Sequence, residues 1–216
     1  MNTDIARLKM IEQQVRAWYV FDPEVLEVLS KVPREQFVPF GYEALAFADT
    51  EIPIGHGQSM MTPTVEGRVL QALELNGTER VLEIGSGNGF LTACMCRLAE
   101  HVTSLDIYED LKKRASENLA DAGVENVELF NMDATQELPD GKFDVIVVTG
   151  SIQRFDPRLV DALDDEGRLF VVVGDAPVMD ARIVRKTGKN AWVSESLFET
   201  MLTPLVNGAL PPQFFF

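Results

Sequence analysis

A glycine-rich turn, LEIGSGNGF at residues 82–90, is the segment of this sequence whose spacing points most directly to chemistry. It lies between an apolar run typical of a buried strand and a segment with helical periodicity. Gly85, Gly87 and Gly89 let the main chain turn tightly and approach a ligand closely, and the N-terminus of the following helix offers free N–H groups to a negative group. The turn therefore predicts a binding site for a nucleotide-like ligand.

The spacing of the glycines separates two classes of cofactor. The dinucleotide fingerprint GxGxxG places its third glycine where helix and strand pack closely, and counting from Gly85 that position holds Phe90. NAD and FAD are therefore disfavoured. The GxGxG spacing, with Glu83 two residues ahead of it, resembles motif I of methyltransferases that use S-adenosyl-L-methionine. A glycine turn without a ligand is the alternative.

Acidic residues follow the next two predicted strands. Asp106 ends the strand after the glycine turn, where a carboxylate can accept hydrogen bonds from both hydroxyls of a ribose. Asp133 ends the strand after that, and in the methyltransferase pattern this position, with Ala134 beside it, faces the adenine amino group. Each acid alone could be a solvated strand end. With Glu83 they make three acids at successive strand ends, on the edge where such sheets bind ligands.

The segment PIGHGQSMMTPTVEG, residues 53–67, is polar and flexible for a connector. Thr62 followed by Pro63 predicts the N-cap and first turn of a helix, so the segment delivers a helix N-terminus that favours a carboxylate. The local pattern leaves two interpretations open: a connector, or one wall of the site. A histidine in such a loop is more often exposed to solvent than functional, and this is the expectation for His56. His101 is expected to end a helix, where a cation complements the helix dipole.

From residue 80 onward, apolar runs alternate with helical patterns. Because the runs are continuous, they predict strands buried on both faces of a parallel sheet. Over residues 180–199 two alternating segments flank a TGKN turn and predict an antiparallel hairpin at one edge. The fold class is therefore α/β, a doubly wound Rossmann-like sheet. The expected strands are 80–85, 102–107, 127–133, 143–150 and 168–175, and the expected helices between them are 90–101, 109–123 and 156–163.

The front section, residues 1–79, is expected to be largely helical. Residues 4–18 and 22–32 fit amphipathic helices, and the second begins with an Asp-Pro pair typical of an N-cap and first helical position. No linker rich in glycine or serine separates this section from the rest. We therefore expect a single domain over residues 1–216, in which a helical and lid section packs on a ligand-binding core, residues 80–216.

The composition suits a globular protein, with 46% hydrophobic and 25% charged residues among 216. No run approaches the roughly 18 apolar residues that a membrane helix needs, and the first ten residues lack the apolar core of a signal peptide. The net charge of −15 opposes nonspecific binding to nucleic acid or to an anionic membrane. Cys94 and Cys96 have no histidine nearby and are expected to pack in the core. We expect a cytoplasmic protein without a metal site.

Five segments in register extend the similarity beyond the glycine turn. They are VPREQFVP (32–39), IPIGHGQSMMTP (52–63), VLEIGSGNGF (81–90), FDVIVVTG (143–150) and TPLV (203–206). Together they resemble the protein-L-isoaspartate O-methyltransferase family, from about residue 8 to 206. The resemblance implies methyl transfer from S-adenosyl-L-methionine to the α-carboxylate of isoaspartyl residues in damaged proteins or peptides, with S-adenosyl-L-homocysteine as the other product. It also implies that the ester collapses to a succinimide, which reopens partly to normal aspartate.

The resemblance implies which residues contact the methyl acceptor and which contact the cofactor. A carboxylate acceptor with a pKa of about 4 is already ionised at neutral pH, so no general base is required and catalysis can rest on positioning. The residues expected at the acceptor are Ser59, Met61 and Thr62. The residues expected at the cofactor are Gln58, Ser59, Glu83, Gly85, Ser86, Gly87, Asn88, Gly89, Asp106, Ile107, Asp133, Ala134 and Thr149.

The resemblance implies that the segment around residues 57–63 forms a lid that contacts both cofactor and substrate, and so one wall of the site. This lid departs from the family pattern, which is GQTIS followed by a variable residue and proline. Ser59 stands at the threonine, Met60 at the isoleucine, and Met61 at a serine whose hydroxyl helps to hold the substrate carboxylate; a thioether donates no hydrogen bond. Thr62 or Ser59 can supply a hydroxyl from a neighbouring position. TGS at 149–151 replaces a threonine and two alanines. Two alternatives therefore stay open: a relative that methylates another acceptor, and a noncatalytic S-adenosyl-L-methionine-binding regulatory protein. The oligomeric state is also open.

Overall fold

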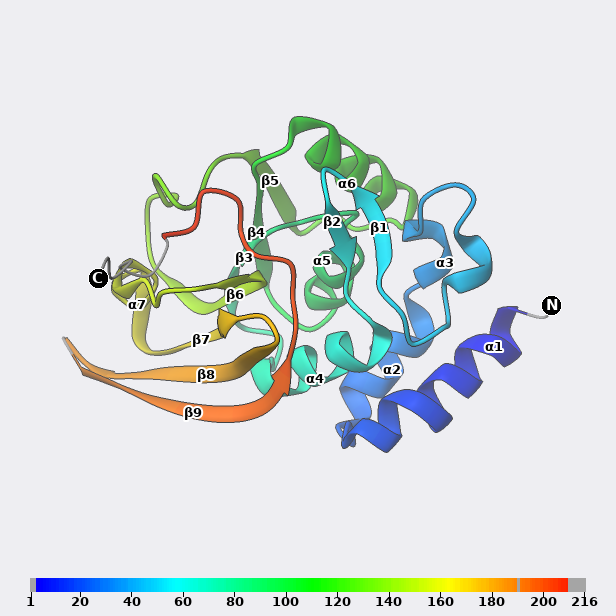
Figure 1. The fold of residues 1–216 in the computed structure, drawn as a ribbon, viewed down its shortest axis with the longest axis horizontal. Helices are drawn as coiled ribbons and strands as arrows, with labels where there is room; N and C mark the ends of the chain where they lie inside the picture. Colours follow the sequence, from blue (N-terminus) through cyan, green and yellow to red (C-terminus); the bar gives the residue numbers. More distant parts are fainter. Residues whose placement is uncertain (1–2, 190, 210–216) are drawn as a thin grey trace, which may run out of the picture.

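The computed structural model describes residues 3–189 and 191–209, and Figure 1 shows their arrangement. The strands from β5 to β7 in the sheet run parallel, and β8 is antiparallel to both of its neighbours. The chain leaves β3 for β4 and β5 and then returns to the other side of β3 as β6. The order of the seven strands is β5 (Val127–Asn131), β4 (His101–Asp106), β3 (Arg80–Ile84), β6 (Phe143–Ile152), β7 (Leu163–Asp175), β8 (Val178–Gly188) and β9 (Ala191–Thr200).

The apolar runs of the central strands divide between two cores. Because alternate residues face opposite sides of a strand, Val145 and Val147 of β6 join one core while Ile146 and Val148 join the other. Helices cover both cores: three helices join the larger core together with the helices of the front section, and one short helix joins the smaller core. The predicted doubly wound α/β fold is therefore confirmed. The three helices are α4 (Pro63–Leu73), α5 (Phe90–Cys96) and α6 (Glu109–Asp121), and the short helix is α7 (Pro157–Asp161).

Within the front section, the helices of residues 3–45 pack on α4. Asp22 accepts hydrogen bonds from the N–H groups of Glu24 and Val25, so the predicted N-cap of α2 is confirmed. The first expected helix is also present, but it changes to π and then to 3-10 geometry before it ends. The elements are α1 (Thr3–Met10), a π-helical turn (Ile11–Val15), a 3-10 turn (Arg16–Trp18), α2 (Pro23–Lys31), α3 (Arg34–Phe37) and a further 3-10 turn (Glu43–Leu45).

A two-stranded antiparallel ribbon, absent from the prediction, lies within the front section. It consists of β1 (Ile52–Gly55) and β2 (Gln58–Met60), and its turn places His56 at a φ of 53°. Strands of this length carry too few residues to show an alternating pattern. The antiparallel hairpin expected near the C-terminus is confirmed as β8 and β9; Asn190 of its turn lies outside the described residues.

Three expected positions differ from the structure. His101 does not end a helix but begins β4, because α5 closes after Cys96 in a turn and the chain must pair with Arg80 of β3. Asp133 lies two residues beyond the end of β5. The strand β7 begins at Leu163, before the charged residues that concealed its start.

Two further expectations concern the interior and the membrane. Cys94 and Cys96 are buried, as the sequence indicated, and they are not joined in a disulfide. Among residues 3–189 and 191–209, no helix has the length and apolar composition needed to span a bilayer.

Candidate functional site

A cavity of about 1050 Å³, open to solvent, lies at the carboxyl ends of the central strands. This is where the strand order reverses, which is the usual ligand position in open α/β sheets. Its walls come from the ribbon, the glycine turn, the loops after β4 and β5, and residues 202–206 after β9. The predicted site residues that line it are Gln58, Ser59, Met61, Glu83, Gly85, Ser86, Gly87, Asn88, Asp106, Ile107, Asp133, Ala134 and Thr149; Thr62 and Gly89 do not line it.

Thr149 of β6 holds the glycine turn in place through its hydroxyl. The Thr149 hydroxyl lies 2.9 Å from the carbonyl oxygen of Ile84 and 2.7 Å from that of Gly85, to either of which it can donate. Gly85 has a φ of 103°, and a Cβ atom at this position would collide with the Thr149 hydroxyl. Only glycine therefore permits both the turn and its close approach to β6.

Asp106 is held rigidly at the floor of the cavity. The Gly87 N–H donates to Oδ2 at 3.0 Å and the Tyr108 N–H donates to Oδ1 at 2.9 Å. Burial raises the pKa of Asp106, and the two N–H donors oppose that rise. Each oxygen retains capacity to accept another hydrogen bond, so the carboxylate can receive a pair of ligand hydroxyls.

Glu83 has one satisfied and one unsatisfied oxygen. Its Oε2 accepts hydrogen bonds from the hydroxyls of Thr92 and Ser104, both at 2.5 Å. Oε1 is buried without a partner among the described residues. Burial raises the pKa of Glu83 to about 7, against the effect of the two hydroxyl donors.

Two more buried polar atoms of the glycine turn lack a partner among the described residues: Ser86 Oγ and Asn88 Oδ1. Such atoms are uncommon in folded proteins and require an explanation. Together with Glu83 Oε1 they offer two acceptor oxygens and one hydroxyl beside the cavity. A ligand with an ammonium and a carboxylate, as in an amino acid, would satisfy all three.

Asp133 is tied to the C-terminal segment. Its Oδ1 accepts from the N–H and hydroxyl of Thr135, and its Oδ2 accepts from Asn207 Nδ2 at 2.8 Å. Burial would raise the pKa of Asp133, but the hydrogen bonds from Thr135 and Asn207 outweigh it, so the pKa lies below its ordinary value. Asn207 did not emerge from the sequence because its contact with Asp133 spans 74 residues.

The segment after β9 forms the wall opposite the ribbon, and in Figure 1 it passes in red back across the sheet. Ser151 of β6 holds it, since its N–H donates to the carbonyl of Thr203 at 3.0 Å and its carbonyl accepts from Leu205 N–H at 2.9 Å. A Cβ atom on Gly150 would lie 2.9 Å from Leu205 Cδ2, so this glycine permits the close approach. The residues that line the cavity from this segment are Leu202, which the sequence did not single out, and Thr203, Leu205 and Val206, which it showed only as part of the TPLV motif.

Met60 at the end of the ribbon and Met61 directly after it are both buried and line the cavity. The next residue, Thr62, accepts a hydrogen bond from Val65 N–H at 3.3 Å, so its predicted role as N-cap of α4 is confirmed. Its hydroxyl also lies 2.9 Å from that of Thr64. Its assignment to the acceptor stays a prediction, and the geometry gives its hydroxyl other partners.

The tip of the ribbon is docked on α6 and on the loop after β4. The His56 ring stacks on Tyr108, with centroids 3.9 Å apart and an interplanar angle of 11°. Its Nε2 lies 2.9 Å from Asp110 Oδ1, and this hydrogen bond lowers the pKa of Asp110. Arg114 donates to the carbonyl of Ile54 at 3.1 Å. These contacts place the ribbon over the segment that carries Asp106.

Comparison with known proteins agrees with the resemblance seen in the sequence. A profile of the protein-L-isoaspartate(D-aspartate) O-methyltransferase family, PCMT, matches residues 6–210. The chain belongs to this family. It is 38% identical to a protein-L-isoaspartate O-methyltransferase from Methanoculleus marisnigri, over 85% of this chain and 84% of the relative. It is 36% identical to protein-L-isoaspartate O-methyltransferase 2 from Pelobacter propionicus, over 95% of this chain and 92% of the relative.

A solved structure shares the fold. It is a Plasmodium falciparum chain assigned to the protein-L-isoaspartate O-methyltransferases, crystallised with S-adenosyl-L-homocysteine, with a TM-score of 0.80 and 21% identity. The alignment covers 96% of this chain and all of the other. This member of the PCMT family therefore keeps the family fold across almost its whole length.

Proposed function

We propose that the protein transfers a methyl group from S-adenosyl-L-methionine to the α-carboxylate of isoaspartyl residues in proteins or peptides. Membership of the PCMT family supports this activity. The observation that carries the cofactor assignment is the set of unpartnered buried atoms, Glu83 Oε1, Ser86 Oγ and Asn88 Oδ1, beside the fixed carboxylate of Asp106. These groups match the amino acid and ribose portions of S-adenosyl-L-methionine.

Residues at the glycine turn and at or just after the ends of the next two strands would each bind a different part of the cofactor. The oxygens of Glu83 and Asn88 would accept hydrogen bonds from the ammonium group, and the Ser86 hydroxyl would donate to the carboxylate. Asp106 would accept from the ribose hydroxyls, and Asp133 with Ala134 would border the adenine. When bound, S-adenosyl-L-methionine supplies an electrophilic methyl group, whose transfer to a carboxylate oxygen breaks the carbon–sulfur bond, leaves S-adenosyl-L-homocysteine and moves no proton.

The task of the acceptor side is to bind and orient a group that is already ionised at neutral pH. Two hydroxyl-bearing residues line the cavity there, Ser59 on the ribbon and Thr203 on the C-terminal segment. We propose that one or both of them donate to the acceptor carboxylate in place of the serine that Met61 replaces. The methionines and Leu205 would exclude water from the same region.

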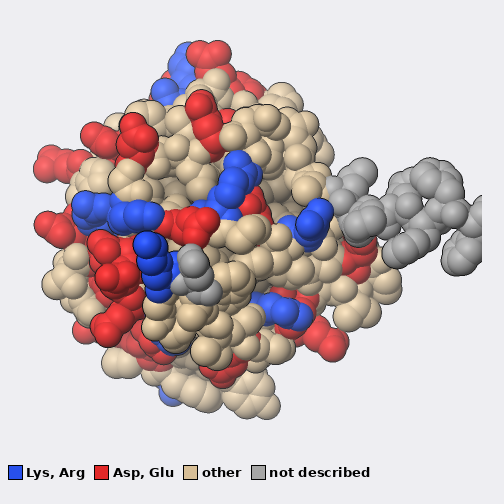
Figure 2. All heavy atoms as spheres, turned by 90° about the vertical axis from the view of Figure 1, so that its left-hand side faces the viewer, with Lys and Arg blue, Asp and Glu red and all other residues tan. Residues whose placement is uncertain are grey.

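A protein or peptide acceptor also agrees with the charge of the molecule. The net charge of −15 opposes association with a polyanion. On the face in Figure 2, which is the left-hand side of Figure 1, basic side chains are interspersed with acidic ones. We therefore propose that nucleic acid is not a substrate.

The test is methyl transfer from labelled S-adenosyl-L-methionine to an isoaspartyl peptide and to its normal aspartyl twin. We expect label in the isoaspartyl peptide and none in the twin. Binding of S-adenosyl-L-homocysteine by calorimetry should accompany this result. A protein that binds the product but labels neither peptide would refute the repair activity.

Met61 favours one second candidate, in which the protein methylates a different acceptor. Its thioether gives no donor to a carboxylate, and its burial makes the wall apolar. An acceptor whose own apolar surface packs on Met61 would then be preferred. Labelling of a small carboxylic acid or alcohol, with no labelling of the isoaspartyl peptide, would support this candidate.

A further inference from the structure

Arg34 lies behind the wall of the cavity and is fully buried. Its Nε donates to the carbonyl oxygen of Ala46 and its Nη2 to that of Met61, both at 2.8 Å. Its Nη1 forms an ion pair with Glu66 Oε2, and its guanidinium lies over the ring of Phe90, 4.8 Å from the centroid. A planar guanidinium can satisfy these partners together, whereas a lysine ammonium cannot.

Three of the four partners line the cavity: Met61, Glu66 and Phe90. They come from different elements, because Met61 follows the ribbon, Glu66 lies in the first turn of α4, and Phe90 begins α5 directly after the glycine turn. Arg34 therefore connects the ribbon wall to the helix that the cofactor-binding turn leads into. Its hydrogen bond to Met61 fixes the main chain at the position where the family pattern has serine.

We propose that Arg34, paired with Glu66, is a positioning residue for methyl transfer. It holds the Met60–Met61 stretch at a set distance from the glycine turn, and so aligns a bound acceptor with the methyl donor. The proposal rests on the methyl transfer proposed above. Arg34 does not itself line the cavity, so it acts through Met61. Alignment matters because a misplacement of about 1 Å can lower a rate on the order of 100-fold.

A purely stabilising role would be served equally well by other residues. Burying two charges carries a large desolvation cost, and apolar residues of similar volume often replace such a pair without loss of stability. Burial raises the pKa of Glu66, and Arg34 limits that rise. The distinctive contribution of the pair is the directed hydrogen bond to the carbonyl of Met61.

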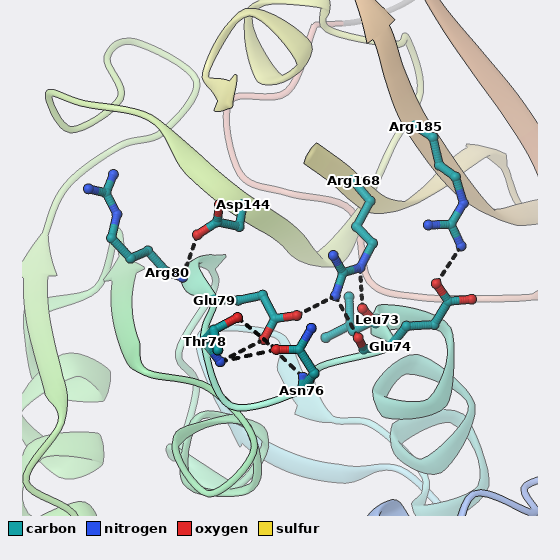
Figure 3. Close-up of polar contacts among 9 residues, drawn as sticks. All are labelled: Leu73, Glu74, Asn76, Thr78, Glu79, Arg80, Asp144, Arg168 and Arg185. Atoms are coloured by element: carbon teal, nitrogen blue, oxygen red, sulfur yellow. Dashed lines mark hydrogen bonds and ion pairs between the residues drawn. The ribbon is translucent and has the colours of Figure 1, made fainter. Parts of the chain in front are cut away.

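A matched control lies at the opposite end of α4. Arg168 of β7 pairs with Glu79 at 3.0 Å and donates to the carbonyls of Leu73 and Glu74, as Figure 3 shows. This pair therefore also joins an arginine to a glutamate and to two main-chain carbonyls. Neither of its charged members lines the cavity.

The experiment compares Arg34→Met/Glu66→Met with Arg168→Met/Glu79→Met, and adds Arg34→Lys in case the first double variant does not fold. Thermal unfolding, calorimetric binding of S-adenosyl-L-homocysteine, and kcat and KM for an isoaspartyl peptide are measured for each. Amide hydrogen exchange over residues 58–62 gives a readout that does not depend on activity.

We expect the Arg34/Glu66 double variant to fold and to bind S-adenosyl-L-homocysteine, but to lose about 100-fold in kcat/KM for the peptide. Its exchange over residues 58–62 should accelerate at least about tenfold. The Arg168/Glu79 variant should keep both properties, and Arg34→Lys should show an intermediate loss.

Wild-type kcat/KM together with wild-type exchange in the Arg34/Glu66 variant would overturn the proposal. Equal losses in the control variant would do so as well, because they would indicate general destabilisation. If the wild-type protein itself labels no isoaspartyl peptide, the proposed function fails, and the exchange measurement still decides whether Arg34 holds the ribbon.

Discussion

Gly87 and Asp106, 19 residues apart in the chain, are joined by a 3.0 Å hydrogen bond from the glycine N–H to Asp106 Oδ2. The same carboxylate thus shapes the glycine turn and faces the cavity. We expect Asp106→Ala to weaken binding of S-adenosyl-L-homocysteine by at least about tenfold, because charge-assisted hydrogen bonds are lost. Calorimetry measures this, with the exposed Asp121→Ala as control. Unchanged affinity in Asp106→Ala would remove the residue from the site.

The free energy of unfolding should fall with rising pH because of the ionisation of Glu83. Burial raises the pKa of its carboxyl from 4.5 to about 7. A carboxyl whose pKa is higher in the folded than in the unfolded protein stabilises the fold fully at pH values below the unfolded-state pKa. This stabilisation is lost as the pH rises through the folded-state pKa. Between pH 4.5 and 7 this contribution should fall by on the order of 3 kcal/mol. Denaturant unfolding at several pH values should show a shallower dependence in Glu83→Gln, and an identical dependence would contradict the assignment.

Two threonine variants test which hydroxyl donates a hydrogen bond to the acceptor carboxylate. Thr203 lines the cavity, whereas Thr62 caps α4. We expect Thr203→Val to lower kcat/KM for an isoaspartyl peptide by about tenfold, because a hydrogen bond to a charged group is lost. Thr62→Val should instead cost about 1 kcal/mol of stability with little change in KM. The reverse pattern would return the acceptor role to Thr62.

Met61→Ser tests the departure from the family pattern directly. If the acceptor carboxylate lies against this wall, a new hydroxyl should raise kcat/KM for the isoaspartyl peptide by more than about tenfold. Met61→Ala is the control, because it opens the same space without adding a donor. Equal effects of the two changes would show that space, and not the hydroxyl, limits the reaction.

His56 should slow the escape of a bound cofactor product. Its stack on Tyr108 and its contact with Asp110 fasten the ribbon to the loop that follows Asp106 and to α6. We expect His56→Ala to speed dissociation of S-adenosyl-L-homocysteine in stopped-flow displacement, and His56→Phe, which retains a ring for stacking, to speed it less. An unchanged dissociation rate in both variants would show that the ribbon does not restrict release.

The front section and the core should unfold as one unit. Arg168 of β7 donates to the carbonyls of Leu73 and Glu74 at the end of α4, so the two sections share a polar junction as well as an apolar core (Figure 3). We expect a single transition in calorimetric unfolding and no early cleavage near residue 75 in limited proteolysis. Release of a core fragment that binds S-adenosyl-L-homocysteine with full affinity would show two domains instead.

Local patterns in the sequence were sufficient for the sheet and for the glycine turn that lines the cavity. The glycines of the turn lie directly after β3, and the acids lie in or just after β3, β4 and β5. Their positions relative to the strand ends can therefore be read along the chain. Continuous apolar runs predicted β6 and β7 because strands covered on both faces leave no polar side. The short ribbon gave no such signal, since β1 and β2 are too brief for a periodic pattern.

The walls of the cavity were decided by contacts between distant parts of the chain. Arg34 meets the carbonyl of Met61 across 27 residues, and Asn207 meets Asp133 across 74. Sequence spacing predicts neighbours on one helix or strand, but not which side chains two separate elements bring together. The sequence by itself therefore determined the family, the sheet and the glycine turn. Only tertiary packing determined that a buried arginine fixes one wall of the cavity and that the chain after β9 closes the other.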